Sequence, residues 1–278
     1  MDARQILDSL AAEATRGNLV FSTHAAIALR VQRLLDDPDC ATADLVRLVS
    51  AEPLLSARVI GIANSLAYNP RGQSISELRS AIARIGFSTL RGLATSIVIR
   101  QMKDQVQGGP HAALAAQLWE HTAHVAALAR VLARRVTRQN PDTAFFAGIA
   151  HEVGSFYLLA RAREFPGLLD GNLEPWHEEG EALLGRAVLH ALDVPPDVCE
   201  GMEILWSGYL AMPPASLGDT LLLANELAPV ESPLDALTDM SRKGMPVELE
   251  MLIDDALLSL ILAESAAEVA SLGAALKA

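Results

Sequence analysis

The chain has 278 residues and a formal net charge of −12, from 34 acidic and 22 basic side chains. Such an acidic surface repels phosphate backbones, which argues against nucleic acid as a partner. Hydrophobic residues make up 51% of the chain but aromatic residues only 4%. A core rich in Ala and Leu favours close-packed helices, because strands prefer β-branched and aromatic side chains. We therefore predict an all-α fold.

The first part of the chain predicts an N-terminal helical lobe over residues 1–107. One helix is expected to begin near Pro53, because the missing N–H of proline costs nothing in a first turn. A second is expected within "SISELRSAIARIG", where Ser74 and Glu77 have capping-box spacing and Gly86 is placed to end the helix. Its apolar stripe consists of Leu78, Ala81, Ile82 and Ile85.

The segment "QGGPH" (107–111) breaks the helical pattern and separates a second helical lobe over residues 108–230. Helices are predicted there at about 112–137, 142–163, 178–193 and 196–206. The segment "MPPAS" (212–216) interrupts the pattern again before the helix "LGDTLLLANELA". No convincing strand pattern is present.

A C-terminal helical extension is predicted over residues 231–278, with a turn-rich start and a helix over roughly 247–276. Its predicted apolar stripe consists of Leu249, Leu252, Ile253, Ala256, Leu257 and Leu260. Such a stripe is expected to pack on its own domain. A seam between two copies is the alternative, so a homo-oligomer is possible.

Arginines gather near the end of the 112–137 helix, at positions 130, 134, 135 and 138. We interpret them as cations that complement the negative end of the helix dipole, not as a nucleic-acid patch.

Cysteine use and hydropathy predict a cytoplasmic protein with no membrane partner. Cys40 and Cys199 are isolated thiols without a CxxC pattern, which is typical of a reducing compartment, although their pairing stays open. The N-terminus lacks the apolar core of a signal peptide. The apolar segment "ALLSLILA" (256–263) is far shorter than the roughly 20 residues that span a bilayer.

The candidate site begins with His151 and Glu152 in "AHEVGSFYLL", on the flank of the predicted 142–163 helix. His121 interrupts the apolar stripe of the preceding helix. An imidazole and a carboxylate suit a divalent ion, but two neighbouring ligands are too few to hold one. A histidine in such a stripe is more often a hydrogen-bonded core residue.

Several ordered segments together resemble the HDOD group, the HD-related output domain of the HD superfamily. They include "LVSAEPLLSARVIGIANSLAY", "LWEHTAHVAALARVLAR" and "DTAFFAGIAHEVGSFYLL", and the resemblance extends over residues 19–228 as one domain. In the N-terminal lobe its most distinctive part is Asn64-Ser65 with Tyr68, followed by Ala81-Ile82 and Ile85-Gly86. We interpret Asn64 and Ser65 as residues that cap the helix and turn the chain. The resemblance implies an HDOD-type architecture, with an N-terminal helical lobe packed on an HD-like lobe.

The resemblance also places the metal ligands of the superfamily. His121 and His151 match histidine ligands, Glu152 stands where the signature aspartate is expected, and Asn225 stands where a late metal aspartate is expected. Additional histidines of many relatives correspond to Leu205, Trp206 and Glu181. Phosphoryl chemistry needs several anionic or imidazole ligands. We therefore interpret His121, His151, Glu152 and Asn225 as a vestigial metal site and expect no cofactor.

Three functions follow as hypotheses. The favoured one is a non-catalytic regulatory module that binds other signalling proteins. The alternative is a metal-dependent phosphohydrolase acting on a nucleotide or phosphodiester, with a divalent ion as cofactor. A third is a scaffold for an assembly.

Overall fold

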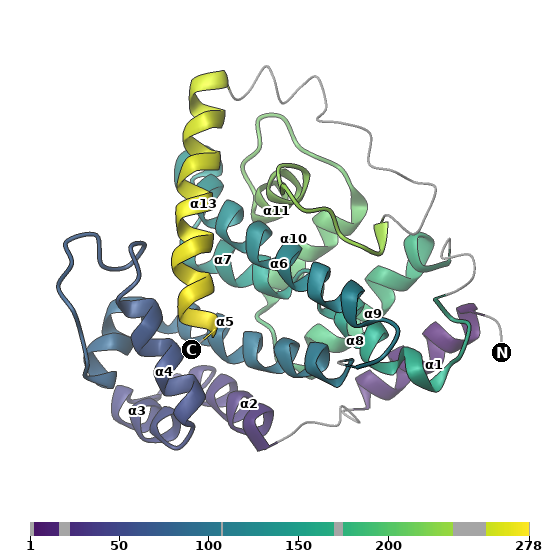
Figure 1. Cartoon of the computed structure of the whole chain (residues 1–278), viewed down its shortest axis with the longest axis horizontal. Coiled ribbons are helices and arrows are strands. Elements are labelled where there is room, and N and C mark those ends of the chain that lie inside the picture. Colours follow the sequence, from purple (N-terminus) through teal and green to yellow (C-terminus); the bar gives the residue numbers. More distant parts are fainter. Residues whose placement is uncertain (1–2, 17–22, 107, 170–174, 236–253, 278) are drawn as a thin grey trace.

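The structure is a computed structural model that describes residues 3–16, 23–106, 108–169, 175–235 and 254–277. The regular elements in these ranges are helices, and no strand occurs among them. The predicted all-α class is therefore confirmed. In Figure 1, α13 stands across the helices of the middle of the chain, while α2, α3 and α4 gather below it.

The N-terminal half is helical throughout its described ranges. Its helices are α1 (Ala3–Thr15), α2 (Thr23–Leu35), α3 (Thr42–Ser50), α4 (Pro53–Ala63) and α5 (Leu78–Gln105). α4 begins at Pro53, as the sequence predicts. α5 is the axis of this half, because α2, α3 and α4 all pack on it. It also packs on α7 and α8 of the second half, so one buried helix serves both halves.

The second half begins after a turn at 108–111. Its helices are α6 (Ala112–Leu132), continued by the π-helical turn η1 (Ala133–Thr137), α7 (Pro141–Ala150), α8 (Val153–Arg161), the 3₁₀ turn η2 (Ala162–Glu164), the π-helical turn η3 (Trp176–Gly180), α9 (Glu181–Ala191), α10 (Pro196–Ser207), α11 (Leu217–Glu226) and α13 (Asp255–Lys277). The pair α6 and α7 forms the centre of this half.

The start of α5 differs from the prediction. The helix begins at Leu78, and its N-cap residue Glu77 makes no side-chain cap, so the capping box of Ser74 and Glu77 is wrong. Gly86 does interrupt the helix, with a φ of 76°. That angle lies in the left-handed region, where glycine carries no steric penalty.

Asn64 and Tyr68 hold the loop between α4 and α5. Asn64 binds the backbone of Ile75 twice: its Nδ2 donates to the carbonyl and its Oδ1 accepts from the N–H, both at 2.7 Å. The hydroxyl of Tyr68 donates to Asp142 Oδ1 at 2.8 Å. The guanidinium of Arg130 lies 3.9 Å above the Tyr68 ring and 3.2 Å from the same Asp142 oxygen. One arginine of α6 thus contacts the loop and α7 together.

The arginine cluster makes contacts with other helices beyond the predicted complement of the helix dipole. Arg138 does cap the helix end, because its Nη1 donates to the Arg134 carbonyl at 3.1 Å. Arg134 and Arg135, however, bind Glu264 of α13, and Arg130 binds Asp142. The cluster therefore joins helices, and its complement to the helix dipole stays a prediction.

The rotation of α13 also differs from the prediction. Ile261, Ser265 and Glu268 point inward, whereas Leu260 is 41% exposed and Ala256 is exposed. Leu249, Leu252 and Ile253 lie outside the described residues. The predicted stripe is thus wrong for Ala256 and Leu260. The ion pairs of Glu264 and Glu268 with Arg134 and Arg135 rotate the helix about its axis, so that Ile261 faces inward in place of Leu260.

The two cysteines are free and half-buried, so the open question of their pairing is settled for this structure. Burial raises the pKa of both thiols. Neither is therefore an activated nucleophile.

Two stretches, Leu78–Gln105 and Pro141–Glu164, are long and apolar enough to cross a membrane by composition alone. Their most apolar windows are 72% and 89% buried within the fold, as in core helices. The cytoplasmic location and the absence of a membrane partner stay predictions.

The division into 1–107, 108–230 and 231–278 also stays a prediction. The turn at 108–111 does separate α5 from α6. α1, however, packs on α9, and α13 packs on both α4 and α6. The predicted segments therefore share extensive contacts.

Glycines allow the helices of the second half to approach closely. A Cβ at Gly148 of α7 would lie 2.5 Å from the Ala126 Cα of α6, well inside van der Waals contact. α6 and α7 therefore meet backbone to backbone.

Gly148→Ala is predicted to lower the free energy of unfolding by about 1–3 kcal/mol, because the added methyl group meets the backbone of α6. Gly92→Ala in α5 is the matched control, since its Cβ would sit 3.4 Å from Phe146 in ordinary contact. Urea unfolding of both variants checks this. An equal effect of the two substitutions would contradict the close approach.

The start of α11 depends on a buried carboxylate. Asp219 accepts from the N–H groups of Ala211, Ala215 and Ser216 and from the Ser216 hydroxyl, at 2.7–3.0 Å. Burial acts to raise the pKa of Asp219, but these hydrogen bonds outweigh it, and the net pKa is lowered.

Asp219→Asn is predicted to lower the free energy of unfolding at neutral pH by about 1–3 kcal/mol, since it removes hydrogen bonds to a charged group. Because the folded pKa of Asp219 is lowered, its stabilisation is present above the ordinary value of 3.8 and is lost as the pH falls through the folded value. The difference between the two proteins should therefore shrink in acid. Asp8→Asn, at an exposed position of α1, should leave stability unchanged at every pH.

Candidate functional site

His151 and Glu152 form the turn between α7 and α8. The prediction of one helix over 142–163, with both side chains on its flank, is therefore wrong. The reason is local: His151 Nδ1 donates to the Gly148 carbonyl at 2.7 Å, and the Ser155 hydroxyl donates to the Glu152 carboxylate. Such short-range bonds compete with the regular helical pattern.

His121 of α6 meets this turn. Its Nε2 lies 3.1 Å from His151 Nε2 and 3.7 Å from Glu152 Oε1. One donor atom from each of the three side chains lies within 4.8 Å of the others. The side chains come together because α6 and α7 approach so closely at Gly148. The structure thus unites three of the four predicted site residues.

All three groups are buried. His121, His151 and Glu152 are 1%, 4% and 6% exposed. Charged groups at such positions require partners, because water is no longer present to solvate them.

The hydrogen bonds fix the tautomers of both histidines. His121 Nδ1 lies 2.7 Å from the Val230 carbonyl, as His151 Nδ1 does from the Gly148 carbonyl. A carbonyl oxygen only accepts, so both Nδ1 atoms carry a proton. In neutral rings both Nε2 atoms would then face each other with lone pairs. Their separation of 3.1 Å requires a proton or a cation between them.

Glu152 is the counter-charge of the pair. Burial acts to raise the pKa of Glu152, but the charges of His151 and His121 and the hydroxyls of Ser155 and Ser232 outweigh it, and the net pKa is lowered. A carboxylate beside a shared imidazole proton forms a compensated buried pair. The carboxylate of Glu152 therefore lies where it can balance a positive charge at the two imidazoles.

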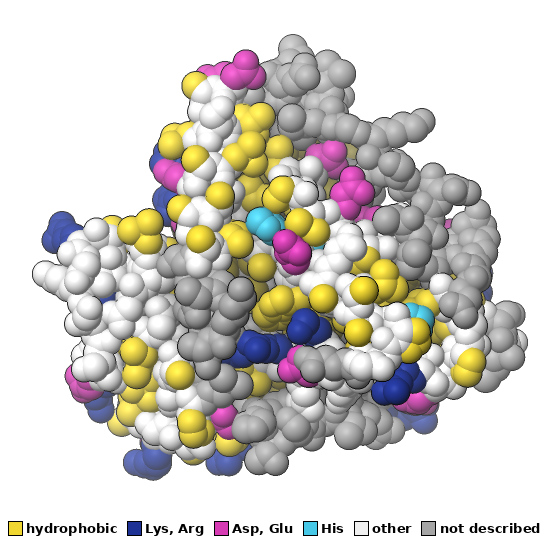
Figure 2. Space-filling model, viewed as in Figure 1, with side chains coloured by type: hydrophobic (Ala, Val, Ile, Leu, Met, Phe, Trp, Pro, Cys, Tyr) yellow, Lys and Arg dark blue, Asp and Glu magenta, His cyan; other side chains and the backbone are white. Residues whose placement is uncertain are grey.

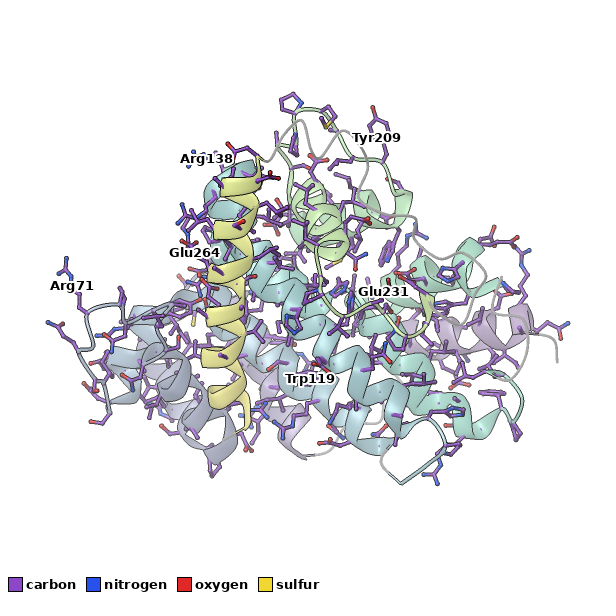
Figure 3. The ribbon with its side chains drawn as sticks, turned by 45° about the horizontal axis from the view of Figure 1, so that its top comes forward. Arg71, Trp119, Arg138, Tyr209, Glu231 and Glu264 are labelled. Carbon is purple, nitrogen blue, oxygen red and sulfur yellow. The ribbon has the colours of Figure 1, made fainter. Side chains whose placement is uncertain are left out.

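The segment at 229–235 covers the cluster. The Val230 carbonyl accepts from His121, and Gln117 Nε2 donates to the Glu231 carbonyl at 3.2 Å. Ser232 is buried above Glu152. Figure 3 shows Glu231 on this segment as it passes across α6. The three side chains are thus largely shielded from solvent.

The donor set nevertheless has features that fit a divalent ion. Two nitrogens about 2.05 Å from a tetrahedral zinc ion lie about 3.3 Å apart, close to the spacing of this pair. Two histidines and a glutamate are also a known set for catalytic zinc. His121, His151 and Glu152 are the residues that would hold an ion, and the ion would supply Lewis-acid activation of water.

Asn225 is not brought into this cluster by any hydrogen bond within the described part of the chain. It lies half-buried in the last turn of α11. Leu205 is buried, and the guanidinium of Arg186 lies 5.4 Å from the Trp206 ring. Glu181 starts α9. These positions supply packing and surface contacts, and the vestigial role of Asn225 stays a prediction.

The sequence did not reveal the partners that orient the cluster. Gly148 and Val230 act through their backbone carbonyls. Every residue type has this group, so the sequence contains no signal for the contact. Ser155 had a usable signal, because it follows Glu152 by three residues, the spacing at which a hydroxyl can reach back to a carboxylate.

Comparisons with known proteins agree with this architecture. A structure from Shewanella amazonensis SB2B, provisionally named a metal-dependent phosphohydrolase, is 26% identical with a TM-score of 0.65, and the match covers 98% of this chain and 100% of that one. An HDOD domain protein of unknown function from Geobacter sulfurreducens is 21% identical with a TM-score of 0.62, covering 99% and 98%.

A third structure, from Marinobacter aquaeolei VT8, is provisionally named a signal transduction protein. It is 17% identical with a TM-score of 0.57, and the match covers 99% of this chain and 66% of that one. No curated protein matches the chain.

The family model of the HDOD domain matches residues 22–203, well over half of the chain. With its helical fold and its ordered HD-like histidines, the chain belongs to the HDOD domain family.

Proposed function

We propose that this protein is a non-catalytic regulatory module that acts by binding other signalling proteins. The observation that carries the proposal is the burial of His121, His151 and Glu152 beneath the segment at 229–235. A hydrolase must admit a phosphate ester and a water molecule to its metal, and these donor atoms have almost no accessible surface. The name of the Marinobacter structure, which shares the fold, adds support.

The hydrogen bonds explain why such a cluster would persist without catalysis. It joins three elements: α6 through His121, the turn after α7 through His151 and Glu152, and the segment at 229–235 through Val230. Buried polar groups with partners specify one arrangement of their surroundings. In this role the former metal site holds these three elements together.

One observation favours the second candidate, a metal-dependent phosphohydrolase acting on a nucleotide or phosphodiester. The three donor atoms converge with ligand-like spacing, and the Shewanella structure carries a phosphohydrolase name. In that case the segment at 229–235 would have to move aside to admit substrate. The two candidates differ in metal content and turnover.

The purified full-length chain, dialysed against Mn²⁺ or Zn²⁺ and then washed, is expected to hold well under one equivalent of metal by mass spectrometry. It is expected not to hydrolyse bis(4-nitrophenyl) phosphate, because its three donors lack an accessible coordination position. One tightly bound ion per chain with measurable turnover, both lost in His151→Ala and kept in the exposed control His190→Ala, would reverse the proposal.

His121→Ala is expected to lower the free energy of unfolding by about 1–3 kcal/mol, since the Val230 carbonyl and His151 lose their partner. In the proposed role, the melting temperature of the wild type should be the same in EDTA and in excess Mn²⁺. A metal site would behave otherwise, because a ligand of the folded state raises the melting temperature as its concentration rises. Thermal unfolding of both proteins under both conditions separates these cases.

A further inference from the structure

The helix α13 packs on α4 and α6, and its Glu264 binds Arg134 and Arg135 of η1. We use the word groove for the surface that these three elements present to α13. In Figure 1 it stands as an upright helix across the layer behind it. It is the last described helix, and it brings the far end of the chain onto both halves of the fold.

Charge complementarity holds α13 in this groove. Arg135 Nε donates to Glu264 at 2.8 Å, and its Nη2 donates to the other carboxylate oxygen. Arg134 Nη2 lies 3.0 Å from Glu264 and 3.6 Å from Glu268. Figure 3 shows Glu264 along the length of α13. In a chain of net charge −12, this basic wall is matched to an acidic helix.

The described apolar part of the contact consists of Ile261 together with the partly buried Leu257 and Leu258. Among residues 254–270 of the chain, Ile261 is the large apolar side chain with no exposed surface, and the other buried positions are Ser265 and Glu268. Leu260 and Leu262 are 41% and 40% exposed. Figure 2 shows apolar side chains on the visible outer face of the column that α13 forms. The described apolar side chains of α13 are thus divided between this contact and the surface.

The polar part of the contact is incompletely paired. Arg130 Nε and Nη1 and Glu268 Oε2 are buried without a hydrogen-bond partner in the described part of the chain. Most buried polar atoms in native proteins do have partners. A contact with three unpaired atoms can exchange one helix for another at lower cost than a core contact.

We propose that the groove between α4 and α6–η1 is a docking site for an acidic amphipathic helix of a partner protein, and that α13 is its competitor within the chain. The partner helix is expected to carry the same pattern of residues as α13. That pattern is a branched aliphatic residue with acidic residues three and seven positions later, as at Ile261, Glu264 and Glu268. This inference rests on the proposed regulatory function and names the surface that function uses. Because a tethered helix competes at high effective concentration, the partner binds well only when α13 is weakened.

The test uses two charge reversals that break the same ion pair. Arg135→Glu alters the groove, whereas Glu264→Arg alters the helix of the chain. A fluorescent peptide of residues 254–277 is added to each full-length protein, and binding is followed by anisotropy. A purely structural ion pair predicts that both reversals act alike on the protein.

The docking site predicts opposite effects. Glu264→Arg should strengthen peptide binding by at least about tenfold over the wild type, because the competitor is weakened and the groove is intact. Arg135→Glu should abolish binding of this peptide and restore binding of a peptide that carries Glu264→Arg. Arg186→Glu, which breaks the separate pair with Glu203, is the matched control and should behave as wild type.

Absence of peptide binding to the Glu264→Arg protein, with α13 amides exchanging hydrogen as slowly as those of α7, would overturn the proposal. Concentration-dependent dimers of the wild type through exchanged α13 helices would also overturn it, since the occupant would then be a second copy. None of these readouts measures metal or turnover. The protein can therefore prove to be a metal-dependent hydrolase while the peptide experiment supports the docking site. Equally, the peptide experiment can contradict the docking site while the metal and turnover measurements support the regulatory function.

Discussion

The close approach of α6 and α7 is the constraint on which the rest of the site depends. Gly148 has no Cβ, so the backbone of α7 lies against Ala126 of α6. The same glycine gives its carbonyl to His151, which turns that ring toward His121. Helix packing and imidazole orientation are thus set at one residue. A larger residue there would disturb both the spacing of the helices and the geometry of the histidine pair.

The cluster that results is satisfied by a proton as well as by a cation. Both histidines donate through Nδ1 and present Nε2 inward, and Glu152 balances a charge between them. The three buried side chains are therefore paired with one another within the described part of the chain.

The helical class and the family could be predicted from the sequence, because they depend on apolar periodicity and on residue types in order. The resemblance to the family also assigned His121, His151 and Glu152 to one site. The sequence did not predict the turn at His151, since Gly148 and Ser155 act through short-range bonds that periodicity ignores. It also misplaced the inner face of α13. Charge pairing with Arg134 and Arg135 set that rotation, and a pattern of apolar residues contains no information about distant arginines.

Through Arg130, the contact between α13 and the fold is connected to the loop after α4. Its guanidinium lies over the Tyr68 ring and against Asp142, and its charge also acts on Glu268 of α13. A change in what fills the groove would alter the electrostatic surroundings of this one cation. The loop after α4, the start of α7 and the glutamate of α13 therefore all border on the guanidinium of one residue.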